Sequence, residues 1–141
     1  SPGGVHFPHV GEAGVGQAAR VYAAAIERFF GEEPPVFDLV LLGLGADGHT
    51  ASLFPGAPEL LECSLPVAAV PSTPTRLSRV SLTLPVINAA RRVVFLVTGV
   101  EKHEALRRVL AGDAALPAGL VRPVGGTLEI FADRAARPAG P

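Results

Sequence analysis

The stretch that decides the fold is FDLVLLGLGADGHTASLFP, residues 37–55. It begins as an apolar run interrupted only by Asp38, and it then breaks into a glycine-spaced turn that carries Asp47 and His49. Such a run predicts a central strand buried on both faces by helices. Open α/β sheets bind ligands where their strands end, so the sequence predicts a ligand site directly after residue 42.

Periodic segments on both sides of this stretch predict further helices and strands. Apolar residues that recur every three or four positions predict a helix, and short β-branched runs between turn residues predict strands. The expected helices cover 14–30 and 101–111, and the further strands cover 65–70, 79–84, 93–98 and 127–131. This alternation favours a Rossmann-like, layered, mostly parallel α/β sheet flanked by helices, within one domain over residues 1–141.

Composition narrows the classes of function. The chain is 48% hydrophobic with a formal net charge of −1, which argues against a nucleic-acid or membrane surface and favours a small-molecule ligand. Its single cysteine, Cys63, fits a reducing compartment, and no apolar leader opens the chain, so we expect a soluble, cytoplasmic protein. No cluster of histidine, cysteine and aspartate has metal-ligand spacing, so a metal site is not expected.

Gly43, Gly45 and Gly48 match the dinucleotide-binding pattern G-x-G-x-x-G. That pattern also requires a helix that opens at the third glycine and an acidic residue about 20 positions later. Pro55 interrupts such a helix, and the downstream segment 65–70 is apolar, so we reject a dinucleotide site. Two interpretations remain: a plain tight turn, or a turn whose glycines bring the backbone close to a substrate.

His49 is the one side chain of this turn that can accept and donate a proton near neutral pH. A lone histidine is more often structural or exposed than catalytic. His49 has Asp47 two residues before it, hydroxyls at Thr50 and Ser52, and strand-end N–H groups suited to an oxyanion. Both a structural and a catalytic role therefore remain open. The histidines without a comparable setting are His6, His9 and His103.

Lys102 is the only lysine of the chain, and it lies where strand 93–98 passes into helix 101–111. The N-terminus of a helix attracts anions, so a cation there is unfavourable unless an anion is present. Lys102 is therefore either an ordinary surface residue or a phosphate ligand, and its position favours the second.

Arg76 and Arg79 lie beside the start of the strand predicted over 79–84. Either guanidinium can bind a phosphate in a bidentate manner. The alternative is that both are solvated or paired with Glu59 or Glu62.

Residues 43–55, GLGADGHTASLFP, resemble the signature of the 6-phosphogluconolactonase family. Similar likenesses appear at 5–6, 11–12, 79–90, 98–102 and 133–136, so the resemblance covers nearly the whole chain. It implies hydrolysis of 6-phosphoglucono-δ-lactone to 6-phosphogluconate in the oxidative pentose phosphate pathway. It also implies a sheet related to that of glucosamine-6-phosphate deaminase, a sugar-phosphate substrate, no metal or organic cofactor and, slightly favoured, a monomer.

Carried over by position, the resemblance implies that His49 is the general base that activates water and then the acid that protonates the departing ring oxygen. Asp47 would polarise or position the site, and Lys102 with Arg79 would hold the 6-phosphate. From geometry we add one expectation, that amides of the glycine turn over 43–45 stabilise the tetrahedral oxyanion.

Phe54 separates this family from its nearest relatives. Deaminases carry Asp-Gly-His-Ile-Ala-Phe-Asn-Glu, in which the closing glutamate assists the histidine, and Phe54 stands at the matching position here. Without that carboxylate the deaminase relay is incomplete, so the lactonase is favoured over the deaminase.

Complete members of the family begin with a β/α portion that contains a Ser-Gly-Gly-Ser/Thr phosphate loop, and nothing in this chain matches it. The resemblance therefore implies that residues 1–141 form about the C-terminal three-fifths of a lactonase domain, with an exposed sheet edge or apolar face. The other hypothesis is a non-catalytic sugar-phosphate-binding module that retains Lys102 and Arg79.

Overall fold

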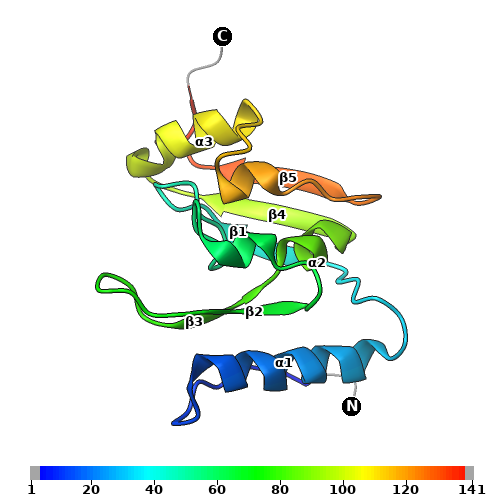
Figure 1. Cartoon of the computed structure of the whole chain (residues 1–141). Coiled ribbons are helices and arrows are strands. Elements are labelled where there is room, and N and C mark those ends of the chain that lie inside the picture. Colours follow the sequence, from blue (N-terminus) through cyan, green and yellow to red (C-terminus); the bar gives the residue numbers. More distant parts are fainter. Residues whose placement is uncertain (1–3, 139–141) are drawn as a thin grey trace.

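A parallel sheet of three strands lies at the centre of the computed structural model, which describes residues 4–138 (Figure 1). The strands β1 (Val40–Gly43), β4 (Arg92–Val97) and β5 (Thr127–Ala132) lie in the order β1-β4-β5. Both pairings are parallel, so the carboxyl ends of the three strands lie at one edge. The predicted layered, mostly parallel sheet is confirmed.

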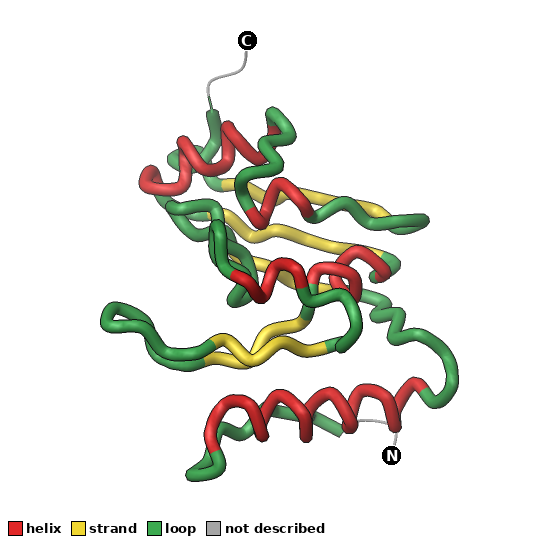
Figure 2. The backbone as a smooth tube through the Cα atoms, in the orientation of Figure 1, coloured by secondary structure: helices red, strands yellow, loops and turns green. Residues whose placement is uncertain are grey.

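A second, smaller sheet pairs β2 (Val67–Val70) with β3 (Arg79–Leu82) in antiparallel register (Figure 2). The long helix α1 (Gly14–Phe30) packs against this hairpin. The shared buried cluster consists of Ala19, Ala23, Ile26 and Val67. The strands predicted over 65–70 and 79–84 therefore exist, but they lie outside the parallel sheet. Parallel pairing needs a crossover of a dozen or more residues, and the connection 71–78 is too short for one.

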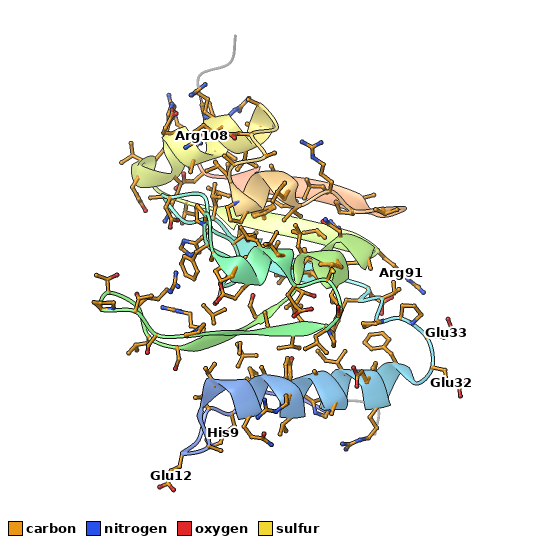
Figure 3. All side chains as sticks on the ribbon, viewed as in Figure 1. His9, Glu12, Glu32, Glu33, Arg91 and Arg108 are labelled. Atoms are coloured by element: carbon orange, nitrogen blue, oxygen red, sulfur yellow. The ribbon has the colours of Figure 1, made fainter. Side chains whose placement is uncertain are left out.

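The predicted helix over 14–30 is confirmed by α1, which ends at Gly31. Gly31 has a φ of 72°, a value that favours glycine, and its N–H donates to the carbonyl oxygen of Glu27 at 2.8 Å. Beyond it, Glu32 and Glu33 point outward from the loop that leads to β1 (Figure 3).

The predicted helix over 101–111 is a 3₁₀ turn, η2 (Val100–Lys102), followed by α3 (His103–Leu110). The prediction missed α2 (Leu84–Ala89), because the β-branched run before it continued the strand pattern. Proline in the first turn starts α2, as it starts the 3₁₀ turns η1 (Pro58–Leu61) and η3 (Pro117–Leu120). No helix within residues 4–138 combines the length and the apolar character needed to cross a membrane.

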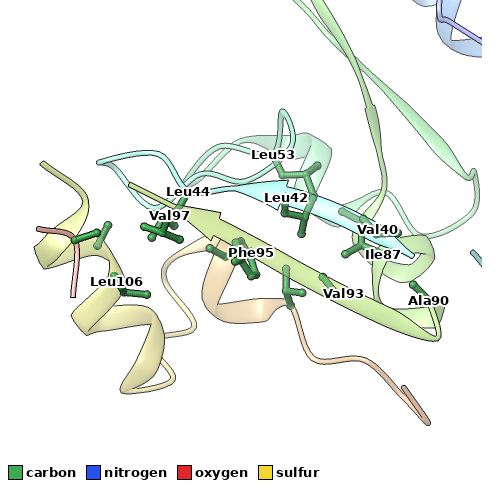
Figure 4. Close-up of a cluster of buried hydrophobic side chains, with 14 residues drawn as sticks. Val40, Leu42, Leu44, Leu53, Ile87, Ala90, Val93, Phe95, Val97 and Leu106 are labelled. Atoms are coloured by element: carbon green, nitrogen blue, oxygen red, sulfur yellow. The ribbon is translucent and has the colours of Figure 1, made fainter. Parts of the chain in front are cut away.

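The main buried cluster is built on the middle strand β4 (Figure 4). Val93, Phe95 and Val97 of this strand are almost fully buried. Ile87 of α2 and Leu106 of α3 belong to the same cluster. The apolar run of β4 therefore behaves as expected for a parallel strand covered by helices.

The opposite face of the parallel sheet is open. Leu41, Leu96 and Phe131 are 60%, 54% and 56% exposed, and the register places Leu96 beside Phe131. Among the described residues β1 pairs with β4 alone. The prediction of a central strand buried on both faces is therefore wrong, because within residues 4–138 β1 has one neighbour and one covered face. The expected exposed edge and apolar face are both present.

Candidate active site

The turn after β1 brings Asp47 and His49 together. Nδ1 of His49 lies 2.6 Å from Oδ1 of Asp47, and the same oxygen accepts the backbone N–H of His49 at 3.1 Å. The side chains are 34% exposed for His49 and 54% exposed for Asp47. The pair is therefore held in place and still within reach of a small molecule.

Asp47 is ionised at neutral pH. Partial burial raises the pKa of its carboxyl group, but the hydrogen bonds from His49 and the charge of the imidazole together bring that pKa below its ordinary value. An ionised carboxylate only accepts hydrogen bonds, so Nδ1 of His49 carries the proton in this contact. In the neutral ring the lone pair then lies on Nε2, so Nε2 is the nitrogen that can accept a proton in a reaction.

Glycine is needed at two positions for this arrangement. A Cβ atom at Gly45 would overlap Nδ1 of His49 and lie 2.5 Å from Oδ1 of Asp47. Gly48 has a φ of 85°, and a Cβ atom there would lie 2.7 Å from the side chain of Leu116. Gly45 therefore leaves room for the His49–Asp47 pair, and Gly48 allows a backbone conformation and a close approach of Leu116 that other residues would not.

The turn uses its own amides to hold its shape. The N–H of Gly45 donates to the carbonyl oxygen of His49 at 2.8 Å, and the N–H of Gly48 donates to Gly45 at 2.9 Å. The hydroxyl of Thr50 donates to the carbonyl oxygen of Gly43 at 2.8 Å. We expected the amides over 43–45 to stabilise the oxyanion; this is wrong for the amide of Gly45 in this structure, because that donor already has a partner, and for the rest of the turn it stays a prediction.

The ends of β1 and β4 bring Lys102 to the same place as His49. Parallel neighbours end at one edge of a sheet, so the turns that follow them are adjacent. Both side chains line a cavity of about 360 Å³, together with Gly43, Gly45 and Ala51. Nζ of Lys102 lies 4.0 Å from the Glu101 carboxylate, a distance that leaves its hydrogens for another acceptor.

Asp133, which the sequence did not single out as a functional residue, holds the turn that leads to Lys102. Its Oδ2 accepts the N–H of Gly99 at 3.0 Å, and its Oδ1 accepts the N–H of Ala136 at 2.7 Å. Gly99 has a φ of 98°. The sequence feature that could have identified Asp133 is its position two residues after the last predicted strand, at the edge of the sheet where ligands bind.

Arg76 contacts the aromatic neighbour of His49. Its guanidinium carbon lies 3.7 Å from the ring centroid of Phe54, and the Phe54 and His49 centroids are 4.6 Å apart. The residue that distinguishes this chain from deaminases thus packs directly on the histidine.

Arg79 lies at the exposed start of β3. Strand alternation places it on the same face as Ser81, whose hydroxyl accepts the N–H of Ser52 at 3.1 Å. Arg79 therefore faces the histidine turn without a hydrogen bond to it in the described part of the chain. There, neither Arg79 nor Arg76 forms an ion pair with Glu59 or Glu62, so the predicted alternative of such pairs is wrong for this structure.

Comparison with known proteins places the chain in a family. The chain matches the family model of glucosamine-6-phosphate isomerases/6-phosphogluconolactonase over residues 2–130. It is 48% identical over 125 residues to the 6-phosphogluconolactonase of Rattus norvegicus, covering 86% of this chain and 49% of that protein. The structure of 6-phosphogluconolactonase from Trypanosoma brucei has a TM-score of 0.75 at 32% identity, covering 96% of this chain and 56% of that one.

A monomeric glucosamine-6-phosphate deaminase has a TM-score of 0.67 at 20% identity, covering 93% of this chain and 57% of that one, and it shares the fold alone. The chain spans about half the length of the curated relatives it matches. On the family match and the sheet described above, this chain belongs to the family of glucosamine-6-phosphate isomerases and 6-phosphogluconolactonases.

Proposed function

We propose that the protein hydrolyses 6-phosphoglucono-δ-lactone to 6-phosphogluconate in the oxidative pentose phosphate pathway. The observation that carries the proposal is the His49–Asp47 contact of 2.6 Å in the same cavity as the single lysine. Relatives named 6-phosphogluconolactonase support the choice of substrate. The single cysteine supports a reducing compartment such as the cytoplasm.

In this reaction His49 acts first as a base and then as an acid. Nε2 accepts a proton from water as the water oxygen bonds to the lactone carbonyl carbon, while Asp47 stabilises the imidazolium through Nδ1. The tetrahedral intermediate then breaks its bond to the ring oxygen. The imidazolium returns the proton to that oxygen, which leaves as the hydroxyl group of the open-chain product.

Lys102 and Arg79 hold the phosphate in this proposal. An ammonium group and a guanidinium group both form charge-assisted hydrogen bonds with phosphate oxygens. Lys102 lines the cavity of His49, and Arg79 lies on the face of β3 that contacts the histidine turn. Gly43 and Gly45 line the same cavity and form part of the wall against which the sugar ring packs, while Gly48 shapes the turn itself.

We further propose that residues 1–141 form the C-terminal part of a lactonase domain. The half-length match to relatives supports this division. So do the open face of the parallel sheet, where Leu41, Leu96 and Phe131 are exposed, and the edge of β1 that has no partner within residues 4–138. A contiguous apolar surface of this kind is rare on an isolated domain.

The test of the proposed function is lactone hydrolysis by the purified protein, followed by acid release with the spontaneous rate subtracted. Saturable hydrolysis of 6-phosphoglucono-δ-lactone supports the proposal. Binding of 6-phosphogluconate without turnover instead supports a non-catalytic sugar-phosphate module. Ammonia release from glucosamine-6-phosphate would replace the proposal with the deaminase.

Asp47→Asn is expected to lower kcat by about 10²-fold or more with little change in KM. The amide NH₂ can donate to Nδ1, which favours the tautomer whose Nε2 carries the proton. The folded-state pKa of Asp47 is lowered, so the carboxylate contact is complete at neutral pH and is lost only as the pH falls through that lowered value. Steady-state kinetics at neutral pH, where this contact is complete, measure the fall in kcat.

Asp38→Asn is the matched control for this prediction. Asp38 is an exposed residue that lies 3.4 Å from Arg91, outside the cavity of His49. A kcat of Asp47→Asn equal to that of Asp38→Asn would contradict the positioning role of Asp47.

Lys102→Ala is expected to raise KM by about 10- to 100-fold, the equivalent of about 1.5–3 kcal/mol for a charge-assisted hydrogen bond. The change removes a contact to the phosphate, which is remote from the bond that breaks, so kcat falls less than kcat/KM. Glucono-δ-lactone, which lacks the phosphate, provides the control substrate. An equal loss on both lactones would argue against phosphate binding by Lys102.

A further inference from the structure

Three planar side chains meet beside the turn after β1, and one of them, that of Arg76, comes from a distant part of the chain. The imidazole of His49 and the ring of Phe54 have centroids 4.6 Å apart and an interplanar angle of 32°. The guanidinium carbon of Arg76 lies 3.7 Å from the centroid of the same Phe54 ring. Phe54 therefore contacts both the histidine and a fixed positive charge.

The backbone of Arg76 is anchored by a tight turn in the β2–β3 connection. The N–H of Thr73 donates to the carbonyl oxygen of Arg76 at 2.8 Å, and the N–H of Arg76 donates back to Thr73 at 3.2 Å. Ser81 of β3 also accepts the N–H of Ser52 at 3.1 Å. The Ser52–Ser81 hydrogen bond joins the hairpin to the histidine turn, and the tight turn fixes the backbone from which Arg76 reaches Phe54.

The guanidinium has no competing partner among the described residues. Nε of Arg76 is buried and its N–H donates no hydrogen bond to the described residues, and the group forms no ion pair with them. Its closest interaction is with the face of Phe54, where a cation is attracted by the negative face of the ring. This contact restricts the flexible side chain of Arg76 to a position over the ring of Phe54.

The ring of His49 needs two constraints to direct Nε2 at a substrate. The Asp47 contact fixes the position of Nδ1 but leaves the ring free to swing about that hydrogen bond. The Phe54 ring, lying along the imidazole, blocks that swing on one side. A Phe54 ring that is itself held by Arg76 is a firmer support than one that can rotate away.

We propose that Arg76 is a positioning residue for His49, acting through Phe54. The inference rests on the proposed function, in which His49 transfers the proton. It predicts that loss of the guanidinium lowers turnover by disordering the imidazole. The substrate contacts of Lys102 and Arg79 stay in place, so KM stays nearly constant.

The test compares Arg76→Ala, Arg76→Gln and the control Arg28→Ala in the whole protein. The Gln side chain keeps a planar group over Phe54 without the charge, and Arg28 is exposed in the last turn of α1. Two readouts are measured for each variant. The first is kcat and KM, and the second is the NMR signals of the His49 ring protons, assigned by their loss in His49→Gln.

Arg76→Ala is expected to lower kcat by about tenfold with KM within about twofold, since small misplacements of a reacting group cost about that much or more. The His49 ring signals, displaced in the unaltered protein by the Phe54 ring current, move toward those of exposed histidines. Arg76→Gln recovers part of both effects, and Arg28→Ala changes neither. Thermal unfolding shows whether each variant is folded. If Arg76→Ala is not folded, Arg76→Gln is compared with the unaltered protein instead.

Two results would overturn the inference. One is an Arg76→Ala protein with unchanged kcat and unchanged His49 signals. The other is a rise in KM alone with unchanged His49 signals, which would make Arg76 a phosphate ligand. If the unaltered protein does not hydrolyse the lactone, the proposed function fails, and the NMR comparison still decides whether Arg76 orders His49.

Discussion

His49→Ala is expected to lower kcat for lactone hydrolysis by about 10²- to 10⁴-fold, the usual contribution of general acid–base catalysis. The substitution removes both the base that takes a proton from water and the acid that returns it to the ring oxygen. The contacts proposed for the phosphate lie on Lys102 and Arg79, so KM changes little. Steady-state kinetics with the spontaneous rate subtracted measure the loss.

His9→Ala is the matched control for this substitution. His9 lies in the segment before α1, far from the parallel sheet (Figure 3). We expect the His9 variant to retain the activity of the unaltered protein. Equal rates for the His49 and His9 variants would exclude His49 as the proton-transfer group. Unchanged far-ultraviolet circular dichroism shows that both variants are folded.

Gly45→Ala is expected to lower kcat by about 10²-fold, although the substitution adds a single methyl group and removes no functional atom. The added Cβ would occupy the space of Nδ1 of His49 and lie 2.5 Å from Oδ1 of Asp47. The two side chains must separate to make room for it. The imidazole then loses both its orientation and the carboxylate that stabilises its charged form.

Gly16→Ala is the control for an added methyl group. Gly16 lies in α1, where a Cβ atom meets only the end of the Arg20 side chain at 3.9 Å, and alanine favours the helix. We expect it to preserve activity and slightly raise the melting temperature. If Gly45→Ala also keeps full activity, the His49–Asp47 contact is not required for turnover.

Interactions between near neighbours in the chain were readable without a structure. The apolar period of α1 predicted its full length, because a helix repeats over a few residues and needs no distant partner to be recognised. Asp47 and His49 are two positions apart on one turn, so their contact follows from local geometry. The position of Lys102 just after the end of a strand was also predicted from the local sequence pattern.

Other features depended on residues far apart in sequence. The partner of β1 decided which of its faces is covered, and an apolar run looks the same in a middle strand and in an edge strand. The short α2 was hidden because Thr83 and Leu84 continue the strand pattern until Pro85 in the first turn starts a helix.

The surroundings of His49 divide in the same way. The chain's own pattern was sufficient to identify the turn, its histidine and the carboxylate beside it, because these lie within a few residues. Only packing brought Arg76 onto Phe54, which lies 22 positions earlier in the chain. Long-range contacts of this kind arise from the meeting of the hairpin with the edge of the parallel sheet, and no local pattern encodes that meeting.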